Sequence, residues 1–391
     1  MKRNLNIRRV CALTAVLGLL TGCWDRVEVD DLAMVMGTGL DWTEDGQMEA
    51  TVQIASPTGI PTVTSGGGGS GKKPVLTLTH KGKAGVDIMN RMQESLSRRL
   101  FLGHRGVIII GEKYARKGVN QNIDQFLRNP DSRYSSYVLT AYGTTAKEIM
   151  STPYMLEQIP AVAIKKMQKD GNTLSSRLDD FIDSLAREGR ATITGAIRIV
   201  NTGDKGKIFL IDKAAVYREK KLLGFLNEDE MMLMLWRRGK IRGLTKGAQV
   251  EPPEELYQGT VGIRYMKAGT KVRTKIEAGK PHVTFELKAR VKVLENDTRL
   301  NLSKDKDIKK IEQAFSENTT KLVKKTIRRS QKVFKEDIFG FGEDIHIQHP
   351  YYWKANQHHW KDIYTDIPVD VKVSYQIERV GRMQEVAHKK K

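Results

Sequence analysis

The spacing of hydrophobic residues predicts strands alternating with helices over the first half of the chain. Residues 47–55 alternate hydrophobic and polar side chains, which indicates a strand, and Asp45-Gly46 just before them is typical of a hairpin turn. Residues 84–100 carry a hydrophobic residue at every fourth position, which predicts a helix. Short apolar runs at 107–110 and 137–142 indicate buried strands. We therefore expect a mixed α/β domain over residues 23–190.

From Thr192 the hydrophobic period changes to two, which predicts further strands up to Tyr217. Asn227 is followed three residues later by Glu230 and then by an apolar run. This spacing predicts a helix that begins with a capping box. Pro252-Pro253 interrupts the pattern. We expect a small middle domain of sheet and helix over residues 191–256.

The remaining residues, 257–391, predict a third domain. Residues 272–276 and 283–293 alternate regularly on either side of a Gly279-Lys280-Pro281 turn, which indicates an antiparallel hairpin. A long helix is expected near 304–335, and the chain ends in a strand around 369–377. The predicted fold class is α+β, multi-domain, with a C-terminal antiparallel sheet packed on one long helix. No internal repeat is visible.

The segment from Met1 to Gly22 has the pattern of a secretory leader. Basic residues, among them Arg8 and Arg9, precede the apolar run Val10–Leu20. As a helix this run is roughly 16 Å long, about half of the ~30 Å hydrocarbon core of a bilayer. Leu20-Thr21-Gly22-Cys23 resembles a bacterial lipobox, which predicts cleavage between Gly22 and Cys23 and a diacylglyceryl group on the Cys23 thiol. The alternative is an ordinary cleavage site followed by an incidental buried thiol.

Lipid at Cys23 would anchor the protein without making it span the membrane, because two acyl chains hold a protein durably whereas one holds it marginally. The chain of 391 residues has a net charge of +20, and removing residues 1–22, which contain four basic and no acidic residues, would leave +16. An exported protein of this charge is expected near anionic headgroups or acidic wall polymers and not on nucleic acid. Cys11 lies within the leader, so the mature chain would have no disulfide.

The basic excess is dense in the expected long helix, where residues 304–335 contain eleven Lys and Arg interleaved with acidic residues. One interpretation is a solvated helix face with intrahelical ion pairs. The other is contact with anionic headgroups or an acidic partner, with help from the tail His388–Lys391.

Candidate chemistry is sparse. Gly66–Lys72 has part of the phosphate-loop spacing, but Lys73 and Pro74 follow in place of the hydroxyl residue and the helix, so a linker is expected. His346, His349, His358 and His359 lie close in sequence to Asp344 and Asp362, but aromatic residues 351–353 and Trp360 favour packing over a metal site. Hydrolase motifs are absent from the sequence. We predict no catalytic residues, no metal and no cofactor.

Several segments together resemble the Ger(x)C family, the lipoprotein C subunits of spore nutrient-germinant receptors. The matching segments are Gly22–Asp25, Gly103–Glu112, Phe126–Pro130, Ala214–Val216, Leu223–Asn227 and Asp337–Gly342. They run through nearly the whole chain in order. Asn129 stands where the family often has Asp, and no family ligand site can be transferred to this chain.

The resemblance implies a non-catalytic subunit with a three-part mixed α/β fold, held through Cys23 on the outer face of the spore inner membrane. Its partners would be a membrane-embedded A subunit and a transporter-like B subunit, with which it would trigger germination by nutrients. A solute-binding lipoprotein that delivers a nutrient to a transporter is the main alternative and would require two similar lobes. A cell-wall hydrolase would require converging acidic or metal-ligating residues.

Overall fold

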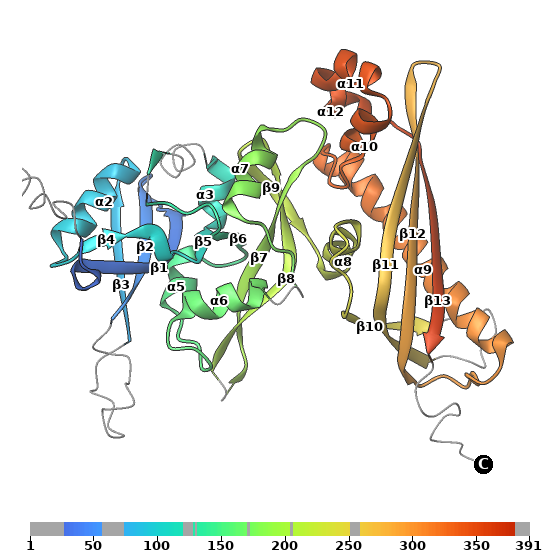
Figure 1. Ribbon diagram of the computed structural model, residues 1–391, viewed down its shortest axis with the longest axis horizontal. Coiled ribbons are helices and arrows are strands. Elements are labelled where there is room, and N and C mark those ends of the chain that lie inside the picture. Colours follow the sequence, from blue (N-terminus) through green and yellow to red (C-terminus); the bar gives the residue numbers. More distant parts are fainter. Residues whose placement is uncertain are drawn as a thin grey trace, which may run out of the picture.

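The computed structural model describes two β-sheets, which lie at opposite ends of an elongated molecule (Figure 1). The described residues are 27–56, 74–119, 128–129, 131–169, 173–203, 206–250 and 259–379. Among them the strands form one nine-stranded and one four-stranded sheet. Several sequence predictions lie outside this part of the chain, namely the leader with Gly22 and Cys23, the linker at 66–72, Pro252-Pro253, the tail 388–391, and Phe126, Leu127 and Pro130 of the segment Phe126–Pro130.

The larger sheet begins with the predicted hairpin. β1 (Leu32–Trp42) and β2 (Met48–Ala55) pair antiparallel, and Gly46 between them has a φ of 76°, a conformation that glycine adopts at little cost. β3 (Val75–Gly82) extends the sheet beyond β2. The short β4 (Arg99–Phe101) pairs with the start of β1.

The centre of this sheet is parallel. β5 (Val107–Ile110), β6 (Tyr137–Ala141) and β7 (Thr192–Asn201) follow β1 in parallel register. All four side chains of β5 are buried, those of Ile108 and Ile110 in one hydrophobic cluster and those of Val107 and Ile109 in another. Both faces are therefore covered, as parallel sheets require. The covering helices are α2 (Gly85–Glu94), α3 (Glu112–Lys117), α5 (Ala146–Ser151), α6 (Pro160–Lys169) and α7 (Leu178–Ala186).

The strands expected in a separate middle domain belong to this same sheet. β7 pairs with β6, and β8 (Lys207–Arg218) and β9 (Lys221–Leu226) continue from it as antiparallel strands. The expected boundary at 190/191 therefore falls inside one sheet. The partner of β7 lies far earlier in the chain, for example Leu139 opposite Gly195, and the local hydrophobic period does not reveal such a pairing.

α8 (Glu228–Arg237) leads from the larger sheet to the smaller one and begins as predicted. The Asn227 side chain accepts a hydrogen bond from the backbone N–H of Glu230 at 2.9 Å, and the Glu230 carboxylate accepts one from the N–H of Asn227 at 2.9 Å. This confirms the capping box. Arg329 also pairs with Glu230, so the cap is joined to the long helix.

Asn227→Ala is expected to lower the free energy of unfolding by about 1 kcal/mol, because it leaves one N–H at the start of α8 without its acceptor. Urea denaturation of the two proteins measures the difference. Asn227→Asp is the matched control, since aspartate keeps the acceptor and is expected to stay within a few tenths of a kcal/mol of the parent. Equal losses in both variants would contradict a capping role.

The smaller sheet has the order β10-β11-β12-β13. β11 (Gly259–Glu277) and β12 (Lys280–Asn296) form the predicted antiparallel hairpin, and β10 (Thr245–Val250) pairs antiparallel with β11. β13 (Val369–Arg379), however, is parallel to β12, so the expectation of a wholly antiparallel sheet was wrong. The chain between β12 and β13 is a helical crossover, and such a connection returns the chain in parallel orientation.

That crossover contains α9 (Asp305–Arg329), the predicted long helix, which continues as a π-helical turn (Ser330–Phe334) and is followed by three shorter helices. These are α10 (Phe341–Gln348), α11 (Pro350–Asn356) and α12 (Trp360–Tyr364). A 3-10 turn spans Gln357–His359 between α11 and α12, and two others, Val29–Asp31 and Leu102–His104, lie in the first part of the chain. α9 buries Ile311, Phe315 and Ile327 against the sheet. It also covers the edge strand, since the Ser316 hydroxyl and Glu312 carboxylate accept from the Tyr375 and Ile377 N–H groups.

Candidate functional site

The histidines considered as metal ligands point to different partners. The His346 ring stacks on Trp353, His349 Nε2 lies 3.0 Å from the Thr274 carbonyl oxygen, and His358 Nδ1 lies 3.0 Å from Glu188. Within the described ranges, no group of three or more His, Cys, Asp or Glu side chains is placed to hold a metal ion. Trp353 and Trp360 are buried as expected, whereas Tyr351, which was expected to pack, is 90% exposed.

Asp337 is the central polar residue where the two parts of the molecule meet. Its Oδ1 accepts from the N–H of Gly340, and its Oδ2 accepts from the N–H of Gly342 at 2.8 Å and from Trp360 Nε1 at 3.3 Å. Its carbonyl oxygen accepts from the N–H of Ala191, next to β7 of the larger sheet. Burial raises the pKa of Asp337 to about 7, against the lowering effect of these hydrogen bonds.

Two glycines allow this junction to close. A Cβ on Gly342 would lie 2.6 Å from Cα of Gly189, and Gly189 itself has a φ of 92°. Arg237 of α8 adds a hydrogen bond to the Phe339 carbonyl and an ion pair of 2.6 Å with Asp344. The Asp337–Gly342 segment therefore has a structural explanation, as the joint between the two sheets.

One face of the smaller sheet, the inner face, packs on α8 and α9, and the outer face is open. The outer face carries the feature with the clearest capacity to bind a partner. A β-bulge decides which side chains point outward. Tyr265 pairs with Val291 and Lys267 pairs with the next residue of β12, Arg290. Met266, between the two, has no partner on β12 and is the extra residue of the bulge. The bulge places Lys267 on the outer face, where strict alternation would have turned it inward.

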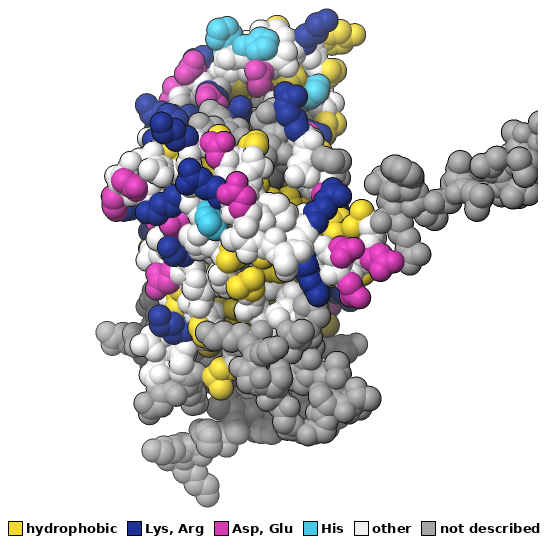
Figure 2. All heavy atoms as spheres, turned by 90° about the vertical axis from the view of Figure 1, so that its left-hand side faces the viewer, with side chains coloured by type: hydrophobic (Ala, Val, Ile, Leu, Met, Phe, Trp, Pro, Cys, Tyr) yellow, Lys and Arg dark blue, Asp and Glu magenta, His cyan; other side chains and the backbone are white. Residues whose placement is uncertain are grey.

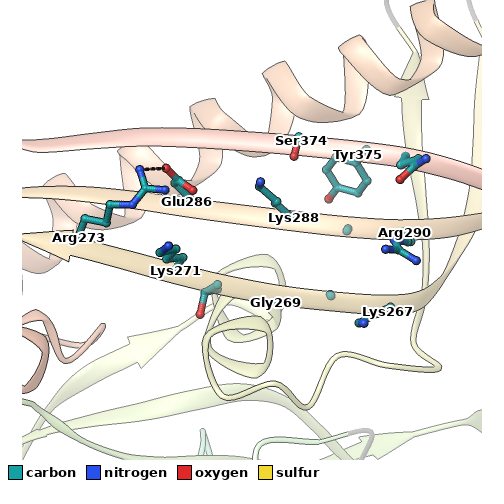
Figure 3. Close-up of a pocket in the computed structure, with 13 residues that line it drawn as sticks. Lys267, Gly269, Lys271, Arg273, Glu286, Lys288, Arg290, Ser374 and Tyr375 are labelled. Carbon is teal, nitrogen blue, oxygen red and sulfur yellow. Dashed lines mark ion pairs between the residues drawn. The ribbon is translucent and has the colours of Figure 1, made fainter.

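The outer side chains line a hollow of about 760 Å³ centred on Gly269 (Figure 3). Lys267 and Lys271 flank this glycine along β11, and Lys288 lies opposite it on β12. A Cβ on Gly269 would meet no atom within 4 Å, so the floor of the hollow is open above the backbone. We call this surface the basic trough and define it by its outward-facing lining residues Lys267, Gly269, Lys271, Arg273, Glu286, Lys288, Arg290, Ser374 and Gln376.

The charges of the basic trough are only partly balanced. Arg273 pairs with Glu286 at 2.9 Å, and Arg290 pairs with Glu378 at 3.0 Å. Lys267, Lys271 and Lys288 are exposed and form no ion pair with any described residue. Five basic side chains and one acidic side chain line the hollow. Such a surface attracts anionic groups.

A buried aromatic layer lies beneath the basic trough. Trp236 of α8 is 1% exposed and donates from Nε1 to the Gly269 carbonyl oxygen at 3.2 Å. Its ring meets Tyr265 and Tyr375 edge-on, with centroids 5.6 Å away in each case. The hydroxyl groups of these two tyrosines are 2.9 Å apart. The hydrogen bond from Trp236 therefore fixes the backbone of Gly269, which forms the floor of the trough.

Positive charge is not concentrated in this way at the opposite end of the molecule. The face that Figure 2 shows has Lys and Arg interspersed with Asp and Glu. The basic stretch 304–335 is partly paired, with Arg329 on Glu230 and Lys332 on Asp366. Sequence reasoning predicted that stretch but missed the basic trough, although basic residues at every second position in 271–275 and 288–292 were a visible signal.

No helix within the described residues combines the length and the apolar character needed to cross a bilayer. The comparisons with known proteins cover nearly the whole chain. Residues 25–199 match the family model described as "Spore germination protein N-terminal domain", and residues 212–381 match "Spore germination B3/ GerAC like, C-terminal". The interval between the two matches falls within β7 and β8 and the turn that connects them.

Relatives match over more than nine-tenths of their length. The chain is 30% identical to YfkR of Bacillus subtilis (strain 168), over 93% of this chain and 94% of that protein. It is 24% identical to spore germination protein KC and 27% identical to spore germination protein B3 of the same organism, over 95% and 93% of this chain and 96% and 95% of theirs. The crystal structure of the GerBC protein matches the fold with a TM-score of 0.52 at 24% identity, covering 88% of this chain and 97% of that one.

Proposed function

Because the chain belongs to the Ger(x)C family of spore germination proteins, we propose that it is the C subunit of a nutrient germinant receptor, anchored by lipid at Cys23 to the outer face of the spore inner membrane. The main support is similarity to spore germination proteins over more than nine-tenths of the chain. The order of the segments from Gly22 to Gly342 agrees with this assignment.

In this role the protein works through contacts with a membrane-embedded A subunit and a transporter-like B subunit, without catalysing a reaction. Its exposed surface includes the basic trough, whose charges are only partly balanced and which therefore suits protein contact. The alternative of a solute-binding lipoprotein is not favoured, because the nine-stranded mixed sheet and the four-stranded sheet are not two similar lobes around a cleft.

Cys23→Ala tests the anchoring step. We expect the variant to lose lipid modification and to leave the spore inner-membrane fraction, and nutrient germination through this receptor to fall to the level of a strain that lacks the gene. Membrane fractionation, mass spectrometry of the mature N-terminus and the loss of optical density during germination measure the three effects.

Cys11→Ala is the matched control, because it removes the chain's other cysteine from within the leader. It is expected to leave anchoring and germination unchanged. An unmodified Cys23 thiol in the wild type, or a Cys23→Ala protein that stays in the membrane and supports normal germination, would overturn the anchoring proposal.

A further inference from the structure

We propose that the basic trough is the docking site for an extended acidic segment of another receptor subunit. This inference rests on the proposed function for the identity of the partner. The binding chemistry itself, a row of carboxylates on a row of lysines, rests on the geometry of β11, β12 and β13 alone.

The positive charge of the outer face runs along the strands and continues past both ends of the trough. On the outer face of β11, Arg264, Lys267, Lys271, Arg273 and Lys275 follow one another, and Gly269 leaves a gap at the centre. Opposite them on β12 lie Lys292, Arg290 and Lys288. Residues 264 to 275 of a strand span roughly 35 Å at about 3.3 Å per residue. A small anion would occupy a fraction of this length, whereas an extended polypeptide would match all of it.

The spacing also suits a polypeptide. Alternate residues of a strand lie about 6.6 Å apart on one face, and an extended peptide presents its own alternate side chains at the same interval. Acidic residues at every second position would therefore face Lys267 and Lys271 in register. The open floor over Gly269 gives room for the backbone of such a segment.

The trough fits a planar anionic bilayer less well. Its charged centre is hollowed, so a flat surface would meet the rims before it reached Lys288. The face also keeps acidic groups, since Glu286 and Glu378 remain within it as ion-pair partners and Asp370 lies 3.1 Å from His282. These carboxylates would face lipid phosphates at close range, whereas a peptide can place neutral side chains opposite them.

The binding test uses the full-length chain in detergent and a fluorescein-labelled ten-residue peptide of alternating Glu and Ser. We expect binding that weakens as salt rises, and a Kd at least about tenfold higher for the triple variant Lys267→Gln, Lys271→Gln and Lys288→Gln. The matched control is Lys321→Gln, Lys324→Gln and Lys325→Gln, which removes the same charge from exposed positions of α9, the helix on the other face of the sheet. Its Kd is expected to change less than twofold.

Three results would overturn the proposal. The first is that the wild type fails to bind the peptide at low salt, and the second is that the two triple variants weaken peptide binding equally. The third result is that the protein binds soluble dihexanoyl-phosphatidylglycerol and not the peptide, and that this binding depends on the three trough lysines; it would assign the face to a lipid surface.

The partner is tested in spores by co-purification of the receptor subunits. We expect the trough variant to stay in the membrane fraction through its lipid but to recover at least about fivefold less of another subunit than the α9 control does. Normal recovery would overturn the assignment to a receptor partner. A further outcome separates the two proposals. If the trough variant recovers less of the other subunit, but a strain that lacks the gene germinates normally, the docking inference stands and the proposed receptor function fails.

Discussion

Replacing Asp337 by asparagine is expected to destabilise the protein by about 2 kcal/mol at pH 5, and to do so less as the pH rises. At pH 5 the Asp337 carboxyl is protonated, but its hydroxyl oxygen can still accept a hydrogen bond, whereas the asparagine NH2 group that replaces one oxygen cannot accept and faces the N–H of Gly340 or those of Gly342 and Trp360. A buried donor left without its acceptor costs about 1–3 kcal/mol. Asp337 fixes the Asp337–Gly342 segment that joins the two sheets, so we expect the lost stability to weaken the contact between the sheets.

The pH dependence follows from the sign of the shift. Burial raises the pKa of Asp337 from 3.8 to about 7, so between these two values the folded protein binds the proton more tightly than the unfolded chain does. The stabilisation from this group is fully present below about pH 4 and is lost as the pH rises through about 7. Each pH unit within that window changes stability by about 1.4 kcal/mol. The asparagine variant lacks this titration.

Urea denaturation at pH 5 and at pH 8, followed by tryptophan fluorescence, measures the effect. The difference between wild type and Asp337→Asn is expected to be smaller at pH 8 by about 2 kcal/mol. The exposed Asp362→Asn is the control, because it removes one carboxylate from the same region without disturbing a buried hydrogen bond. A difference that does not vary with pH would show that Asp337 is not a proton-binding group of the junction.

Local features of this fold were predictable because their causes lie within a few residues. The capping box at Asn227, the hairpin around Gly279 and the buried face of the long helix all follow from short-range spacing. The turn itself lies earlier than the predicted Gly279-Lys280-Pro281, because Lys280 and Pro281 already pair with Glu277 and Ile276. Ala278 and Gly279 have φ values of 49° and 77°, which match the two central residues of a type I′ turn.

Pairings that depend on distant parts of the chain were not predictable in this way. The parallel orientation of β13 depends on the path of the whole helical crossover between it and β12, and the membership of β7 in the larger sheet depends on β6. The basic trough shows the same limit. Alternating lysines were readable, but the bulge at Met266 and the register of three strands decide which of them share a face with Gly269.

Trp236→Ala is expected to have the largest effect on stability, a loss of about 3–5 kcal/mol in the free energy of unfolding. The indole is 1% exposed and packs edge-on against both Tyr265 and Tyr375, so truncation leaves a large cavity in the core of the smaller sheet. It also removes the donor to the Gly269 carbonyl oxygen, which holds the floor of the basic trough. We therefore expect weaker peptide binding together with the lower stability.

Urea denaturation and the fluorescent peptide measure the two effects of Trp236→Ala separately. Trp236→Phe keeps most of the ring contacts and loses only the N–H, so its stability is expected to lie between those of the wild type and the alanine variant. Tyr351→Ala is the surface control: this aromatic side chain is 90% exposed, and its removal is expected to change stability by less than about 0.5 kcal/mol. Similar losses for Trp236→Ala and Tyr351→Ala would contradict the view that the aromatic layer under Gly269 is what holds this sheet and its trough in place.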